Sequence, residues 1–453
     1  MSPNGLRPAE YRGQPTVASP LTSNEHAVEL PDWATSSAEQ PPLEVVPMAG
    51  HVARRRVIGI DAARGVALLG MIAVHALYAN DAKGNPTMSF SIAAGRAAAL
   101  FAVLAGVGIS MTTGRRKVRR GCEGWAAAAS LATRALTLVV IGLIVGYYAD
   151  AALGTVILVY YGALFLLAIP LVFLPTRVVA VTGVVIAISA PALSQLVRGG
   201  LPAPLYDHPT LVYLMQSPGR LLADVFVTGE YPALPWLAYV CAGLVIGRLQ
   251  LTSLKVARRL LGIGVAMAVV AKFAAWVALG QLGGSNRIFA TAQGSGLSMA
   301  KVSELLAFGG DGITPLSTWW WLATAAPHTS TPLDLIHTTG TAMVVIALML
   351  LLTDAAKPAR AFRAASVLKP LRAAGGMTLT LYCAHIAFTN SPLDQFSAMS
   401  GYVVQIVSAM LFALVWSSIQ GKGPLESVVT RLSHHARDAV LSRSADGPSQ
   451  VQP

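Results

Sequence analysis

Apolar residues dominate the chain in windows of about twenty residues between Val57 and Ile419, and short polar stretches separate these windows. As an α-helix, a window of that length crosses the roughly 30 Å hydrocarbon core of a bilayer. The pattern therefore predicts an all-α fold, a polytopic membrane helix bundle of about ten transmembrane helices. The predicted spans are 57–79, 92–111, 125–148, 153–174, 177–197, 232–249, 259–281, 334–353, 374–391 and 402–420.

The two ends of the chain lack these windows. Residues 1–53 hold eight of the 27 prolines and six of the 21 acidic residues, a composition typical of disorder. Three arginines at 54–56 stand directly before the first window, and no signal-peptide pattern precedes them. We therefore expect a disordered cytoplasmic N-terminal tail over 1–53, a membrane domain over 54–433 and a disordered cytoplasmic C-terminal tail over 434–453.

Composition and charge place the protein in a membrane. Hydrophobic residues make up 54% of the chain and charged residues 12%, against roughly 25% charged in an ordinary soluble domain, which excludes a soluble enzyme. With a cytoplasmic N-terminus, the inner loops hold 22 Lys and Arg residues and the outer loops five. This asymmetry predicts a multi-pass membrane protein with both termini in the cytoplasm. We expect its location to be a bacterial-type inner (plasma) membrane, in keeping with the family resemblance described below. The net charge of +12 suits anionic lipid, so we expect membrane lipids and no nucleic acid as partners.

Ionisable side chains inside the predicted spans are candidates for function, because each is costly in hydrocarbon unless it meets a partner or a wet cavity. On the first span Asp61, Arg64 and His75 share one helical face, and His75 lies about 21 Å along the axis from Asp61. We expect Asp61 and Arg64 near the cytoplasmic side, as substrate ligands or as a structural ion pair. His75 then lies near the outer side, as a general base or as a hydrogen-bonded interfacial histidine.

Further candidates extend this set across the bilayer. Arg134 lies at mid-depth, where a lone buried guanidinium favours binding of an anionic group. Arg96, His337 and His385 lie in the outer half, so the polar groups form a ladder if their helix faces converge. His385 is also a candidate catalytic histidine. His328 belongs to an outer loop flanked by prolines and aromatic residues, which makes it a second candidate base, although loop histidines are usually solvated and inert.

The run from Arg56 to His75, with Asp-Ala-Ala-Arg-Gly at 61–65, resembles the opening span of the transmembrane acyltransferases related to heparan-α-glucosaminide N-acetyltransferase, including the YeiB-like bacterial branch. One region departs from the family, which has Trp-Asn-Gly and an Asp near its second span where this chain has Met88–Arg96. The resemblance covers about 56–432. The other similar blocks are Phe101–Gly108, Arg134 with Ile141–Leu143, Ile157–Gly162, Tyr231–Arg248, Gly375–Tyr382 and Gly423–Glu426.

This resemblance implies an integral membrane enzyme that moves an acyl group, acetyl being the expected one, from cytoplasmic acyl-coenzyme A to a cell-envelope glycan or glycolipid at the outer face. It implies an essential histidine at the outer end of the first span, where His75 is the histidine available. It also implies Tyr161, Trp236 and Tyr382 as donor- or substrate-binding residues, and a homodimer is possible. No metal is expected, since the three cysteines are scattered.

Two other classes remain open. A secondary transporter or flippase for an anionic or lipid-linked envelope precursor would also use intramembrane arginines as ligands. Its usual signs, repeated halves and matched breaks in helices, are missing from the sequence. A non-catalytic scaffold leaves the buried Arg134 unexplained. Hydrolysis of acyl-coenzyme A, or labelling of an acceptor, separates the enzyme from both alternatives.

Overall fold

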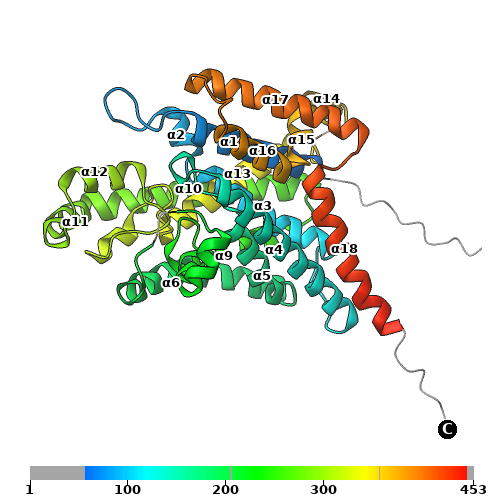
Figure 1. Ribbon diagram of the computed structural model, residues 1–453, viewed down its shortest axis with the longest axis horizontal. Helices are drawn as coiled ribbons and strands as arrows, with labels where there is room; N and C mark the ends of the chain where they lie inside the picture. The colour runs from blue at the N-terminus through cyan, green and yellow to red at the C-terminus, as the bar shows by residue number, and fades with distance from the viewer. Residues whose placement is uncertain (1–56, 205–206, 357, 446–453) are drawn as a thin grey trace, which may run out of the picture. The chain divides into compact units, whose positions relative to one another are not determined.

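The computed structural model describes residues 57–445 apart from 205–206 and 357, and the predicted tail over 1–53 lies outside the described residues. In this part of the chain the regular structure is helical, accompanied by one isolated bridge between Asn80 and Pro86, so the all-α prediction is confirmed (Figure 1). The α-helices are α1 (Ile58–Ala76), α2 (Met88–Ala93), α3 (Arg96–Thr112), α4 (Cys122–Tyr148), α5 (Leu158–Val172), α6 (Thr176–Val197), α7 (Leu211–Gln216), α8 (Pro218–Ala223), α9 (Ala233–Gly247), α10 (Leu254–Trp276), α11 (Gly284–Ala292), α12 (Met299–Phe308), α13 (Pro332–Leu352), α14 (Pro358–Val367), α15 (Lys369–Gly375), α16 (Thr378–Thr389), α17 (Ala398–Ile419) and α18 (Pro424–Ala445).

Within the described residues, seven helices are long and apolar enough to cross a membrane. The other three predicted spans coincide with shorter apolar helices, which are α5, α9 and α16. Each of the ten predicted spans thus coincides with an apolar helix, while the count of ten crossings stays a prediction. The seven long helices are Ile58–Ala76, Met88–Thr112, Cys122–Tyr148, Thr176–Gly200, Leu254–Gln281, Pro332–Leu352 and Ala398–Ile419.

The helix bundle has two ends, called here the Ile58 end and the Ala76 end after the first and last residues of α1. Asp354, which follows α13, accepts hydrogen bonds from the backbone N–H groups of Ile58 (3.1 Å) and Gly59 (2.6 Å). A carboxylate in this place satisfies two unpaired donors of a helix start and lies at the positive end of the helix dipole. The start of α1 is thereby tied to the end of α13.

Helices α3 and α9 cross in the centre of the bundle with their backbones in contact. A Cβ atom on Gly243 of α9 would lie 1.9 Å from the carbonyl oxygen of Val103, and one on Gly106 of α3 would lie 2.3 Å from that of Val240. Glycine is required at both positions, because any side chain would force the helices apart. The two helices form a buried frame. Helix α6 packs against α9 and α10 packs against α13, and both outer helices expose apolar side chains.

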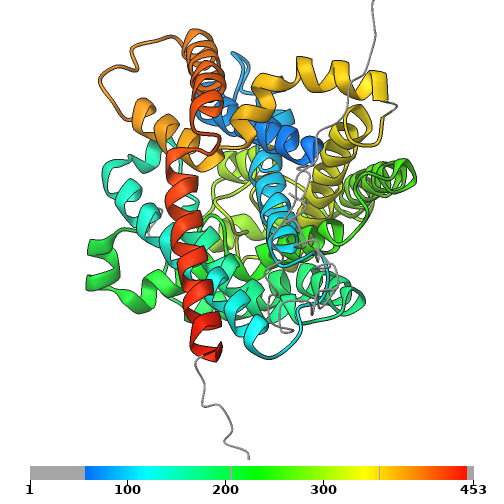
Figure 2. The same ribbon diagram turned by 90° about the vertical axis from the view of Figure 1, so that its right-hand side faces the viewer.

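The C-terminal part of the chain corrects one prediction. Helix α18 continues to Ala445, so residues 434–445 are helical where the sequence predicted a disordered tail from 434 onward. It packs along α4 (Figure 2), and the Cys122 thiol lies 3.8 Å from the carbonyl oxygen of Val440. The polar composition of residues 434–445 suggested disorder, but contacts with other helices hold this segment as a helix. Residues 446–453 of the predicted tail lie outside the described residues.

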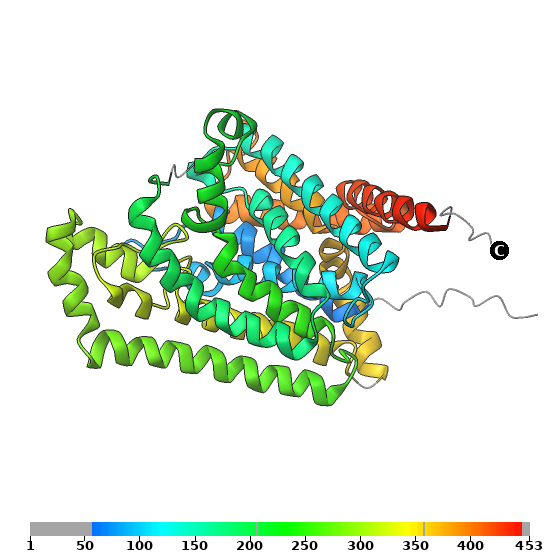
Figure 3. The ribbon, with the colours of Figure 1, turned by 90° about the horizontal axis from the view of Figure 1, so that it is seen from below.

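A small second core lies where the chain continues beyond α10 toward α13 (Figure 3). It joins α11, α12 and the 3-10 segment η6 (Trp319–Ala323), and its centre is Trp321 packed against Ile288 and Val302. The Trp321 indole N–H donates to the Ser317 hydroxyl at 3.0 Å, so this buried ring has its polar group satisfied. This core orders the segment that leads to the His328 loop.

Candidate functional site

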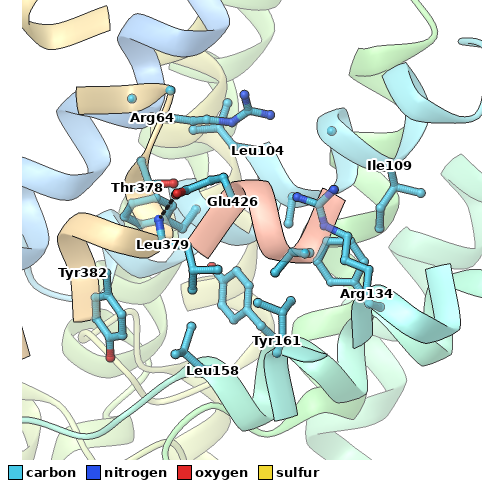
Figure 4. Close-up of a pocket in the computed structure, with 18 of the residues that line it drawn as sticks. Arg64, Leu104, Ile109, Arg134, Leu158, Tyr161, Thr378, Leu379, Tyr382 and Glu426 are labelled. Carbon is cyan, nitrogen blue, oxygen red and sulfur yellow. Dashed lines mark hydrogen bonds between the residues drawn. The ribbon is translucent and has the colours of Figure 1, made fainter. Parts of the chain in front are cut away.

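Two cavities extend into the bundle from its two ends. Cavity A has a volume of about 270 Å³ and lies toward the Ile58 end, between α1, α3, α4, α5, α16 and α18. Cavity B has a volume of about 430 Å³ and lies at the Ala76 end. Figure 4 shows cavity A, whose polar lining includes Arg64, Arg134, Tyr161, Tyr382, Lys422 and Glu426.

Arg64 brings a positive charge to cavity A through an ion pair on α1. Its Nη1 atom lies 2.9 Å from Oδ1 of Asp61. Asp61 is buried and does not line the cavity, whereas the Arg64 side chain is partly exposed and does. The structure therefore shows the ion pair, and the substrate-ligand role stays a prediction. Asp61 orients Arg64, and Arg64 faces the cavity.

Arg134 on α4 also faces cavity A (Figure 4). Its guanidinium carbon lies 5.4 Å from the centroid of the Phe165 ring, a cation–π contact. Its Nε atom is buried, and no hydrogen-bond partner for it exists among the residues the structure describes. With Arg64 and Lys422 against the single carboxylate of Glu426, the cavity suits an anionic ligand.

Glu426 is held by the start of α16 and so joins α18 to the cavity wall. Its carboxylate accepts hydrogen bonds from the backbone N–H groups of Leu379 (2.7 Å) and Thr380 (3.2 Å) and from the Thr380 hydroxyl (2.6 Å). These are first-turn donors that have no partner within their own helix. The family resemblance covered Glu426, but its capping role was not foreseen, because a residue that caps a distant helix has no local pattern.

Tyr161 and Tyr382, both implied by the resemblance, line the deep part of cavity A. The Tyr161 hydroxyl donates to the carbonyl oxygen of Ala98 at 3.2 Å. The Tyr382 hydroxyl accepts from the backbone N–H of Ile157 at 3.2 Å. Both rings are thus oriented by backbone groups of neighbouring segments.

Cavity B contains His75 and His328 together with four carboxylates that the sequence reasoning missed. A signal in the sequence could have indicated them. The chain as a whole is strongly basic, yet acidic residues occur in its two long predicted outer segments, 198–231 and 282–333. A cavity with this charge favours a neutral or cationic ligand group over an anionic one. The carboxylates are those of Asp207, Asp224, Glu230 and Asp311.

His75 belongs to a chain of three side chains. Its Nδ1 atom lies 2.9 Å from Nε2 of His385 on α16, and Nδ1 of His385 is hydrogen-bonded to Oε1 of Gln405 on α17. Because the amide oxygen only accepts, His385 carries its proton on Nδ1 and accepts on Nε2. His75 then carries its proton on Nδ1, and its Nε2 atom has the free lone pair.

The free nitrogen of His75 lies against the loop that follows α4. A Cβ atom on Gly154 would lie 2.8 Å from Nε2 of His75, and Gly154 has a φ of +134°. Both the space and the backbone conformation require glycine here. The loop thus closes over the ring while His75 and Gly154 both line cavity B.

His328 enters cavity B from a strained loop. Its φ is +53° and that of Ser330 is +49°, in the left-handed region that is costly for residues with a side chain. Its Nε2 atom accepts from the backbone N–H of Gly95 at 3.1 Å, which leaves the proton on Nδ1. Nδ1 is buried, and the described part of the chain offers it no partner. Burial lowers the pKa of His328, so the ring is neutral at neutral pH.

Five predicted residues line neither cavity A nor cavity B: Asp61, Arg96, Trp236, His337 and His385. Arg96 and His337 contact each other at 3.2 Å, and Nδ1 of His337 lies 3.0 Å from the carbonyl oxygen of Ala268. The Trp236 indole donates to the Ser330 hydroxyl at 3.2 Å, and its ring packs against Tyr231 behind cavity B. The polar residues that were predicted to form one continuous ladder across the bilayer therefore lie in several separate sites.

A thin layer of side chains separates the two cavities. On α1, Met71 lines cavity A and His75 lines cavity B, one helical turn or about 6 Å apart. On α5, the adjacent residues Tyr160 and Tyr161 line cavities B and A respectively. On α16, Tyr382 of cavity A lies one turn from His385, the hydrogen-bond partner of His75.

The described residues contain no group of three or more His, Cys, Asp or Glu side chains that could hold a metal ion. The histidines of cavity B are engaged instead with Gly95 and His385, as described above.

Comparison with known proteins adds one match. Residues 56–281 match the family model of heparan-alpha-glucosaminide N-acetyltransferase, catalytic. The matched segment includes Arg64, His75, Arg134, Tyr161 and Trp236, and ends before the His328 loop and α16. No curated protein matches the chain.

Proposed function

Because the chain belongs to the heparan-alpha-glucosaminide N-acetyltransferase catalytic family and is a membrane acyltransferase, we propose that it moves an acyl group between the two cavities. Acyl-coenzyme A, with acetyl as the expected group, occupies cavity A. The acceptor occupies cavity B. The single observation that carries this proposal is the one-turn separation between Met71 and His75, which brings a donor and an acceptor from opposite ends to one reacting point.

The donor is recognised by the positive charge of cavity A. Arg64 and Arg134 both line cavity A and supply forked donors that match phosphate oxygens. The thioester end extends past Tyr161 and Tyr382 toward Met71. The acyl carbonyl would then lie at the layer of side chains between cavities A and B, which includes His75, His385 and residues of α5.

The chemistry begins at Nε2 of His75, the ring nitrogen with the free lone pair, which lies beside Gly154 in the lining of cavity B. It removes the proton from an acceptor hydroxyl or amine as the acceptor atom bonds to the acyl carbon. The carbon–sulfur bond then breaks, and the coenzyme A thiolate takes the proton back from the imidazolium. His385 stabilises the imidazolium through the bond at Nδ1, and the Nδ1–H group of His328 is the candidate donor to the developing oxyanion.

A covalent variant uses the same atoms. Nε2 of His75 attacks the thioester, an acyl-histidine forms as coenzyme A leaves, and the acceptor then takes the acyl group. The variant predicts a labelled enzyme when acceptor is withheld. Direct transfer predicts no label.

The acceptor we propose is a carbohydrate of the cell envelope, as a glycan or glycolipid. The four carboxylates of cavity B accept hydrogen bonds from sugar hydroxyls and favour a protonated amine over an acidic group. Positive-inside charge supports an inner (plasma) membrane location with the Ile58 end in the cytoplasm, where acyl-coenzyme A is made.

A secondary transporter is the second candidate, because two cavities at opposite ends also fit alternating access. Release of coenzyme A distinguishes the two. Purified protein in lipid nanodiscs is given radiolabelled acetyl-coenzyme A and an envelope extract, and free thiol is measured. We expect acceptor-dependent release that is lost in His75→Gln and kept in the control His434→Gln, an exposed position on α18. Absence of acceptor-dependent thiol release would contradict the enzyme.

Binding of the donor is measured separately. Arg134→Ala is expected to weaken acetyl-coenzyme A binding by about 1.5–3 kcal/mol, the range for a hydrogen bond to a charged group. Arg134→Lys restores part of the affinity, because an ammonium lacks the planar fork. Arg437→Ala, at an exposed position on α18, is the control. Unchanged affinity in calorimetry would show that Arg134 does not bind the donor and has a structural role.

A further inference from the structure

A third cavity, cavity C, opens between α1, α2 and α3 on one side and α10 and α13 on the other. We propose that it holds the hydrocarbon chain of the acceptor, which makes the acceptor a lipid with a phosphate between its chain and its sugar. This inference rests on the proposed function and specifies its substrate class.

The lining of cavity C is almost wholly apolar. Its volume is about 480 Å³, within the usual range of about 300–1,000 Å³ for ligand pockets. Of the sixteen residues that line it, Ser91, Arg96 and Thr341 have polar side chains. The others are aliphatic or glycine, so the cavity favours a hydrocarbon occupant over water or sugar.

The cavity opens toward the membrane. Ile92, Val265 and Val269 line it and are 62%, 46% and 60% exposed, respectively. In helices that cross a bilayer, apolar side chains with this exposure contact lipid tails. A lipid chain can therefore enter sideways, between α2 and α10, without leaving hydrocarbon.

Arg96 marks the end of the cavity that meets a headgroup. It is the first residue of α3, at the Ala76 end of the bundle, and it is half-buried. Two hydrogen bonds hold it, to the carbonyl oxygen of Ala94 (3.4 Å) and to His337 (3.2 Å). A guanidinium has five N–H donors, so others are left for a ligand. Among the described residues Arg96 has no ion-pair partner, and a phosphate group would supply one.

Cavities B and C lie next to each other along one face of α1. Ala67 and Gly70 line cavity C, and Val74 lines cavity B. Val74 lies on the same helical stripe, one turn or about 6 Å beyond Gly70. On the opposite wall, Gly95 hydrogen-bonds His328 of cavity B and precedes Arg96 of cavity C. A chain in cavity C with a phosphate at Arg96 therefore directs an attached sugar toward His75.

The first test reads occupancy of cavity C without catalysis. The protein is reconstituted in phosphatidylcholine nanodiscs that contain a trace of phosphatidylglycerol with a diazirine on its acyl chain, and crosslinked peptides are mapped after illumination. We expect crosslinks on the cavity faces of α1, α10 and α13. Val269→Trp, which fills the mouth, should abolish them, while Val270→Trp, a neighbour that is 63% exposed and does not line the cavity, should leave them unchanged.

The headgroup contact is tested in the same system. Arg96→Gln should lower crosslinking by the phosphatidylglycerol probe about tenfold relative to a matched diacylglycerol probe, which has no phosphate; this is the loss expected for a hydrogen bond to a charged group. Crosslinks that are absent, or that Val269→Trp does not reduce, would overturn the assignment of cavity C.

The acceptor class is tested by partition of the product. Membranes receive radiolabelled acetyl-coenzyme A, and the label is separated between chloroform and water. We expect label in the lipid phase, lost in Val269→Trp and retained in Val270→Trp. If coenzyme A is released but the label stays in the water phase, the lipid acceptor is wrong and the acyltransferase stands. If no coenzyme A is released, the proposed function itself fails, and the crosslinks still report on cavity C.

Discussion

At the residue scale, the protonation of His75 is set by groups that touch it and not by its own sequence surroundings. Gln405 orients His385, and His385 orients His75, so that one nitrogen of His75 is left with a lone pair. A neutral imidazole in this tautomer is ready to remove a proton. We predict that His75→Gln lowers turnover by about 10²- to 10⁴-fold, with donor affinity nearly unchanged, when initial rates and calorimetry are compared. Retention of more than about a tenth of the turnover would move the base to another histidine.

His328 allows a second prediction at this scale. Because burial lowers its pKa below the usual value near 6.5, it stays neutral through the working range and offers Nδ1–H as a donor. His328→Ala should lower kcat by about 10²- to 10³-fold, as loss of one oxyanion donor does, with the KM for the donor retained. The acidic limb of the pH–rate profile should not move, because His328 acts in this step as a neutral hydrogen-bond donor and not as the base that takes the proton. A shifted limb would assign the titrating role to His328.

At the scale of elements, α18 is the helix whose placement matters most for the site. Glu426 near its start caps α16, which carries Tyr382 and His385. Glu426→Ala should reduce the free energy of unfolding by about 0.5–2 kcal/mol, the range for loss of a helix cap, and should weaken turnover by loosening α16. Asp438→Ala, at an exposed position on the same helix, is the control for thermal unfolding. Equal melting temperatures for Glu426→Ala and Asp438→Ala would show that the cap does not contribute to the stability of the fold.

At the scale of the whole molecule, the two cavities have a function only if the membrane separates them. The positive-inside pattern predicts that a reporter fused after Arg120 reads as cytoplasmic, and that one fused after Leu201 or Ser285 reads as extracytoplasmic. Phosphatase and fluorescent reporters measure this directly. Reversed signals would place cavity B on the side where acyl-coenzyme A is made and would contradict the order of donor and acceptor.

Sequence alone determined the helical class, the positions of the apolar helices and several residues of the site. Hydropathy identifies spans because the bilayer imposes a local rule, about twenty apolar residues in a row, that needs no knowledge of neighbours. The rule also picks out Arg64, His75 and Arg134, since a charged or polar side chain in such a window stands out without any contact being known.

Only the tertiary structure decided which of these residues meet. His75 and His385 are 310 positions apart, and nothing in either window encodes their hydrogen bond. The same holds for the carboxylates of cavity B, the cap that Glu426 forms and the lipid-facing cavity at Arg96. The polar sequence of the C-terminal half of α18 resembles that of a disordered tail. The segment is helical because α18 packs against α4 and α16. Propensity and hydropathy are properties of a segment, whereas a site depends on which faces of distant segments pack together.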